Sequence, residues 1–114
     1  MVTYSLKKSY QLKNLQEIDF KDLWGDHGIF TTMWIFGKPP KILFFDNHIE
    51  NLIQSLNKFG INKISLKKDI LSIINKNLSK TNNYNHLLRI ALNKKIISIS
   101  LRKRIPPKLN FNLR

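Results

Sequence analysis

An apolar hairpin followed at once by an amphipathic helix is the feature of this sequence that most constrains its fold. Residues 29–36 (IFTTMWIF) alternate between two largely apolar sets of side chains, which predicts an interior strand covered on both faces. Residues 37–40 (GKPP) must turn the chain, because proline fixes φ and removes a backbone donor. Residues 41–45 are then expected to form the return strand.

The helix after this hairpin is predicted to begin at Asn47 as its N-cap, with Glu50 at capping-box spacing. Gly60 is placed to end it in the left-handed conformation. A second helix, capped by Ser65, is expected over residues 66–79. The apolar residues of the first helix fall within roughly 120° of its circumference: Ile49, Leu52, Ile53, Leu56 and Phe59.

Short strands are predicted on both sides of this unit. Residues 2–6 and 9–12 are expected to form a hairpin or a single bent strand, and residues 13–24 a loop with one helical turn. A second hairpin is expected to pair residues 87–92 with residues 95–102. The order β, β, β, helix, helix, β, β predicts an α+β domain in which two helices pack on one face of an antiparallel sheet.

The net charge of +13 is compatible with two interpretations. A basic surface can bind the phosphates of nucleic acid. Lys, Asn and Ile are enriched together, however, as the codons of an AT-rich genome would produce, and the lysines are scattered rather than gathered in a run. We therefore adopt codon bias as the explanation and keep nucleic-acid binding as an alternative.

Composition excludes several classes of function. The chain has no cysteine, so it forms no disulfide, thiolate metal site or cysteine nucleophile. Its three histidines share no ligand spacing, and no metal site is predicted. No apolar run approaches a membrane span and the first residues have no signal-peptide core, so a cytoplasmic location is expected.

Three segments resemble a known family when taken in order. They are Asp19 with GDHGIFTT at residues 25–32, DNHIENLIQSLNKFGI at residues 46–61, and LLRIAL at residues 87–92. Together they resemble the small domain of class IV pyridoxal-phosphate enzymes, which include branched-chain and D-amino-acid aminotransferases and aminodeoxychorismate lyase. The resemblance covers nearly the whole chain. It implies a small α+β domain that packs against a larger one, with pyridoxal phosphate and substrate between them.

The resemblance also implies roles for individual residues. Phe30 and Thr32 match positions that line the substrate side, and Trp34 shares their strand face. Arg89 matches an arginine that contacts the substrate carboxylate in some branched-chain enzymes, a task that suits a guanidinium fork. The Phe-Thr-Thr form is most similar to aminodeoxychorismate lyase.

The cofactor phosphate of the family is bound at the start of the helix after the hairpin. The resemblance places His48 and Asn51 of this chain there, with Asn51 where relatives carry an arginine. An amide can hydrogen-bond a phosphate, but it cannot pair its charge.

The family's Schiff-base lysine belongs to the second domain. Residues 1–107 match the small domain, and residues 108–114 resemble the first strand of the second. We therefore expect a truncated or split small domain with no catalytic residue of its own. Its partner would be a second pyridoxal-phosphate-binding domain or another subunit, and its substrate an amino acid or amino-chorismate. The alternatives are a basic nucleic-acid-binding module and a non-catalytic interaction protein.

Overall fold

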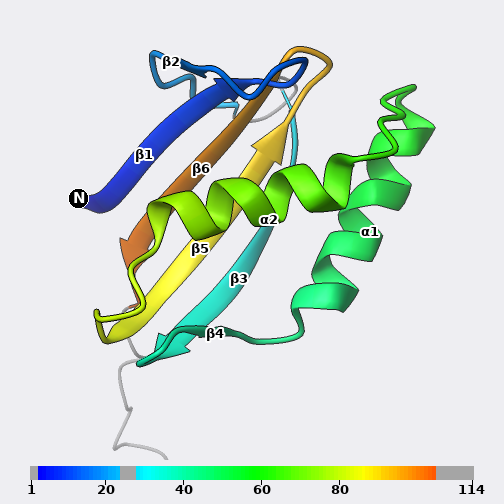
Figure 1. The fold of residues 1–114 in the computed structure, drawn as a ribbon. Coiled ribbons are helices and arrows are strands. Elements are labelled where there is room, and N and C mark those ends of the chain that lie inside the picture. The colour runs from blue at the N-terminus through cyan, green and yellow to red at the C-terminus, as the bar shows by residue number, and fades with distance from the viewer. Residues whose placement is uncertain (1–2, 24–27, 105–114) are drawn as a thin grey trace, which may run out of the picture.

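The computed structural model describes residues 3–23 and 28–104 as an α+β fold (Figure 1). Six strands form one antiparallel sheet in the order β2-β1-β6-β5-β3-β4. In chain order the elements are β1 (Tyr4–Gln11), β2 (Glu17–Ile18), β3 (Ile29–Gly37), β4 (Lys41–Ile42), α1 (Phe45–Lys58), α2 (Leu66–Asn77), β5 (Tyr84–Leu92) and β6 (Ile96–Lys103).

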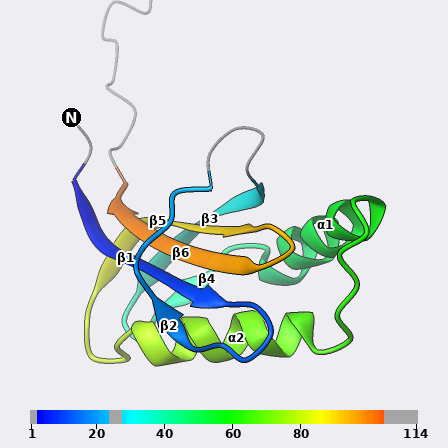
Figure 2. The ribbon, with the colours of Figure 1, turned by 90° about the horizontal axis from the view of Figure 1, so that it is seen from above.

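Both helices lie on the same side of the sheet, and the core lies between them and the strands (Figures 1 and 2). Apolar residues of α1 and α2 join one buried cluster with alternate residues of β3, β5 and β6. Side chains alternate across a strand, so the cluster takes only one of the two faces. Its fully buried members include Met33, Ile35, Ile49, Leu56, Ile70, Leu88, Ile90, Ile97 and Ile99.

The prediction that residues 29–36 form a strand is confirmed, but its expected burial on both faces is wrong. Met33 and Ile35 are buried beneath the helices, whereas Phe30, on the other face, is 47% exposed. The reason is that both helices occupy one side of the sheet. Apolar side chains on both faces of β3 therefore do not imply two covering layers.

The start of α1 also differs from the prediction. The return strand ends at Ile42 rather than at residue 45, and the helix already begins at Phe45. Its N-cap is Phe44 in the left-handed conformation, with φ 54° and no side-chain cap. The first helical hydrogen bond runs from the His48 N–H to the Phe44 carbonyl. Asn47 therefore lies inside the first turn, and the predicted capping box does not form.

The end of α1 agrees with the prediction. Gly60 has φ +80°, and its N–H donates to the Asn57 carbonyl while the N–H of Ile61 donates to the Leu56 carbonyl. This pair of bonds is the Schellman motif. Ile61 and Leu56 are both buried, which supplies the apolar contact that accompanies the motif.

Four further predictions are resolved by the structure. Residues 4–11 form the single strand β1. The loop with one helical turn predicted at residues 13–24 contains the two-residue strand β2 instead, and residues 13–23 contain no helix. Helix α2 has Ser65 at its N-cap position as predicted, although the Ser65 hydroxyl donates to the Asp69 carboxylate rather than accepting from the backbone. Strand β5 begins at Tyr84, three residues before its predicted start at residue 87. The strand predicted at residues 108–114 lies outside the described residues.

Two features are absent from the described residues. None of their helices has the length and apolar character needed to cross a membrane. Residues 3–23 and 28–104 also contain no group of three metal-ligating side chains.

Replacing Gly60 by alanine tests the end of α1. An ideal Cβ there would meet no atom within 4 Å, so any effect comes from the backbone conformation. Because an L-residue in the left-handed region is disfavoured by about 1 kcal/mol, we expect the free energy of unfolding to fall by roughly that amount. Urea denaturation measures it, with exposed Phe59→Ala as the control. An unchanged midpoint for Gly60→Ala would contradict a stabilising role for the motif.

Candidate functional site

The sheet face turned away from the helices, here called the open face, carries the polar and aromatic side chains of the strands. Cross-strand pairing aligns Thr32 of β3, Arg89 of β5, Ser100 of β6 and Lys7 of β1 in one row. Such neighbours have side chains on the same face of the sheet. All four predicted substrate residues, Phe30, Thr32 and Trp34 of β3 and Arg89 of β5, therefore come from adjacent strands of this face.

Part of the open face is covered by residues 19–23, here called the strap. The strap is fixed through the backbone of Lys21, whose N–H donates to the Ser9 hydroxyl at 2.8 Å and whose carbonyl accepts from the Ser98 hydroxyl at 2.7 Å. The two serines are buried, and their oxygens lie 2.6 Å apart. Because the Ser98 proton goes to Lys21, Ser9 is the donor between the two hydroxyls.

The end of the strap explains one glycine of the family-like motif. Leu23 is buried, and a Cβ at Gly28 would lie only 2.8 Å from the Leu23 Cβ and 3.0 Å from the Leu92 carbonyl oxygen. Real Cβ atoms do not approach other atoms so closely, so only glycine fits at this point. Gly28 therefore allows the strap to pack against β5.

Beside the strap, the open face holds a cavity of about 290 Å³. Its size is near the lower end of the range for small-molecule sites. The cavity combines two guanidinium groups, two aliphatic hydroxyls, two aromatic rings and one leucine. They belong to Arg89, Arg102, Thr32, Ser100, Tyr4, Phe30 and Leu87.

Arg89 is a mostly buried cation of this cavity. Its guanidinium lies 4.6 Å from the centre of the Phe30 ring, and its side chain is only 16% exposed. Nη2 donates to the Leu23 carbonyl at 3.4 Å, and Nη1 lies 3.6 Å from the carboxylate of Asp22. The strap and Phe30 thus restrict the orientation of the guanidinium. A planar fork held in this way suits the recognition of a carboxylate.

Trp34 lies further along β3 and does not line the cavity. Its indole N–H donates to the Asn85 side chain at 2.9 Å, and its ring centre is 4.7 Å from that of Phe36. The guanidinium of Arg104 is 4.7 Å from the indole ring. This arrangement forms a second aromatic and cationic group next to the cavity.

The two predicted cofactor residues lie on the other side of the sheet. Nδ1 of His48 is 3.1 Å from the Thr31 hydroxyl, and Thr31 points to the helix side because its neighbours Phe30 and Thr32 point to the open face. Asn51 is exposed on α1. The structure therefore separates His48 and Asn51 from the predicted substrate residues by the thickness of the sheet.

The start of α1 does not suit a phosphate group. Asp46 and Glu50 bring two carboxylates to the turns that carry His48 and Asn51, and a carboxylate repels a phosphate. The only cation paired with this turn among the described residues is Lys67, which lies 3.2 Å from the Asp46 carboxylate. These residues do not form a phosphate site on their own.

Sequence reasoning missed four of the residues that line the cavity, namely Tyr4, Leu87, Ser100 and Arg102. Ser100 and Arg102 share one face of β6, but the alternation along this strand does not reveal which strand lies beside it. Tyr4 reaches the cavity from β1, next to an irregularity in the pairing of β1 with β6. These residues meet only because the strands have the order β1-β6-β5-β3, and that order depends on contacts between residues far apart in the sequence.

Comparison of the chain with models of protein families, with characterised proteins and with solved structures gives no match. Part of the family-like motif, at residues 24–27, lies outside the described residues. The geometry of the open face therefore carries the functional argument.

Replacing Ser98 by alanine tests the attachment of the strap. The change leaves the Lys21 carbonyl and the Ser9 hydroxyl without their partner, which is expected to cost about 1–2 kcal/mol of unfolding free energy. Hydrogen exchange at the strap amides should also become faster. Ser100→Ala is the control, because Ser100 is buried on the same strand but is not part of this network. Equal stability of the two variants would contradict the proposed attachment.

Proposed function

We propose that this chain is the small domain of a class IV pyridoxal-phosphate enzyme and that its open-face cavity forms one wall of the substrate site. The observation that carries this proposal is the meeting of Phe30, Thr32 and Arg89 in a single cavity. These residues were selected from two separate segments of the sequence, residues 25–32 and residues 87–92. The meeting of the two segments in one cavity supports the resemblance.

The cavity has the chemistry expected of a site for an amino carboxylate. The restrained fork of Arg89 would bind a carboxylate through two N–H groups. Thr32 and Ser100 offer hydroxyls on either side of Arg89, while Phe30 and Leu87 contact the apolar body of the substrate. Arg102 brings a second cation to the same cavity, which favours a substrate with a second anionic group.

The remaining part of the site would come from a second domain packed on the open face. That domain would contribute the Schiff-base lysine. It would also contribute the phosphate contacts, because the start of α1 lacks a free cation among its described neighbours. When bound, pyridoxal phosphate supplies an electron sink for the substrate. The role of this chain is to orient the carboxylate and to exclude water from that side.

A titration with 4-aminobenzoate tests the carboxylate site. We expect changes in the amide NMR spectrum to centre on Phe30, Thr32 and Ser100, because these residues line the cavity. Arg89→Gln should weaken binding by roughly tenfold or more, as expected when a charged hydrogen-bond donor is lost. Arg104→Gln, on the same face but outside the cavity, is the control. Binding that persists unchanged in Arg89→Gln would overturn the proposed role of this arginine.

A second test concerns the cofactor. Added pyridoxal phosphate should produce no stoichiometric imine band at about 410–430 nm with this chain alone, because none of its lysines matches the Schiff-base position. Borohydride treatment followed by mass spectrometry provides the check. A stoichiometric band that borohydride removes, with one lysine modified, would show that this chain carries the covalent site itself.

A second candidate function is the binding of single-stranded nucleic acid on the same face. Arg89 lies over Phe30, Arg104 over Trp34, and Lys7 is 5.5 Å from the centre of the Tyr4 ring. Aromatic rings on an antiparallel sheet can stack on bases while nearby cations contact the phosphates. The net charge of +13 favours the same partner.

Fluorescence anisotropy with a labelled oligouridine tests this candidate. The affinity should fall steeply as salt is raised, because bound phosphates release counterions. Trp34→Leu should weaken binding by about tenfold, as expected for the loss of one stacked base. Undetectable binding at low ionic strength, or binding that does not depend on salt, would remove this candidate.

A further inference from the structure

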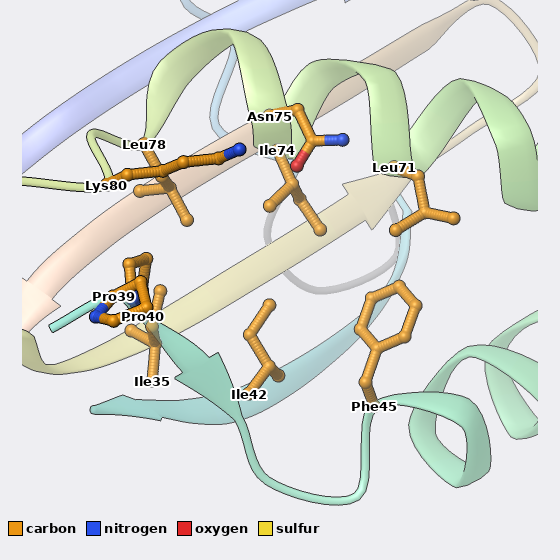
Figure 3. Close-up of a pocket in the computed structure, with 10 residues that line it drawn as sticks. All are labelled: Ile35, Pro39, Pro40, Ile42, Phe45, Leu71, Ile74, Asn75, Leu78 and Lys80. Atoms are coloured by element: carbon orange, nitrogen blue, oxygen red, sulfur yellow. The ribbon is translucent and has the colours of Figure 1, made fainter. Parts of the chain in front are cut away.

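A larger cavity lies on the helix side of the sheet, between α2 and the connection from β3 to α1 (Figure 3). Its volume is about 570 Å³, within the usual range for small-molecule sites. Eight of its ten lining residues are apolar, and the other two are Asn75 and Lys80. Because the sheet separates it from the open face, an inference about it is independent of the proposed function.

The cavity is a groove with two apolar walls. Leu71 and Ile74 of α2 and its C-cap residue Leu78 form one wall, and Ile42 and Phe45 face them from the other side (Figure 3). The stripe from Leu71 to Leu78 extends over roughly 10 Å at the helical rise per residue. An extended alkyl chain of about eight carbons has a similar length.

The two walls differ from ordinary core packing because the groove remains open to solvent. Ile74 at its base is 5% exposed, whereas Leu71 at its rim is 38% exposed. An apolar chain lying in the groove would remove both surfaces from water, a gain of about 0.8 kcal/mol for each methylene buried.

Lys80 gives the groove a polar end. Its side chain runs along the α2 wall with the ammonium directed toward Asn75 (Figure 3). None of the ten lining residues is acidic, so the charge at this end is positive. A carboxylate at the Lys80 end would receive a charged hydrogen bond, and the Asn75 amide offers a second donor.

We propose that this groove binds a linear alkyl monocarboxylate of medium length. The hydrocarbon chain lies along the stripe from Leu71 to Leu78, and the carboxylate is bound by Lys80. The linear shape favours an alkyl chain over a bulky ring system. The cationic end favours a carboxylate over an alkylammonium ion.

Isothermal titration calorimetry with hexanoate, octanoate and decanoate, all below their micelle concentrations, tests the alkyl part. The affinity should rise by about fourfold for each added methylene until the groove is filled. Octanoate should also bind several-fold more tightly than octan-1-ol, and octylammonium should bind most weakly. Saturable binding with this order supports the proposal. An affinity that is independent of chain length, or no saturable binding, overturns it.

Two variants locate the ligand. Lys80→Met should remove the preference for octanoate over octan-1-ol while the alcohol still binds. Lys68→Met is the control and should leave that preference intact, because Lys68 lies on α2 but outside the lining residues. Leu71→Asp should reduce octanoate binding by at least tenfold, because it places a carboxylate on the rim. Circular dichroism checks that each variant is folded. If both lysine variants retain the wild-type preference, Lys80 is not the carboxylate partner and the proposal fails.

Discussion

The burial of a single face of the sheet beneath two helices is the constraint on which the rest of this structure depends. Because side chains alternate along a strand, covering one face also decides which residues stay on the other. Met33, Leu88 and Ile99 meet the helices and form the centre of the core. Thr32, Arg89 and Ser100 are the sequence neighbours of these three residues and are directed to the open face.

The open face is organised by polar contacts that need burial to be effective. Ser9 and Ser98 are removed from water and hold the backbone of Lys21, which brings the strap over β1 and β6. The strap in turn restricts Arg89 from one side, while Phe30 restricts it from another. A cationic cavity thus forms where a bare sheet would show only scattered side chains. The groove on the helix side arises differently, because α2 and the β3–α1 connection do not close over Ile74.

Most elements were predictable from local patterns, and the differences have identifiable causes. The alternation in residues 29–36 and the periodicity in residues 49–59 correctly predicted β3 and α1. The capping-box spacing at Asn47 was misleading, because the left-handed turn at Phe44 starts the helix three residues earlier. For the candidate site, the sequence resemblance selected Phe30, Thr32 and Arg89, which share a cavity on the open face. It also selected His48 and Asn51, which lie on the helix side of the sheet.

Local sequence thus determined the strands, the helices and the Gly60 end of α1, since each depends on residues within one or two turns of the chain. The same information established that both faces of β3 are apolar. Only the tertiary structure decided which face stays open, that Arg102 joins Arg89, and that Lys80 lies at the end of an apolar groove. Those outcomes depend on strand order and helix placement, which are set by contacts between residues far apart in the chain.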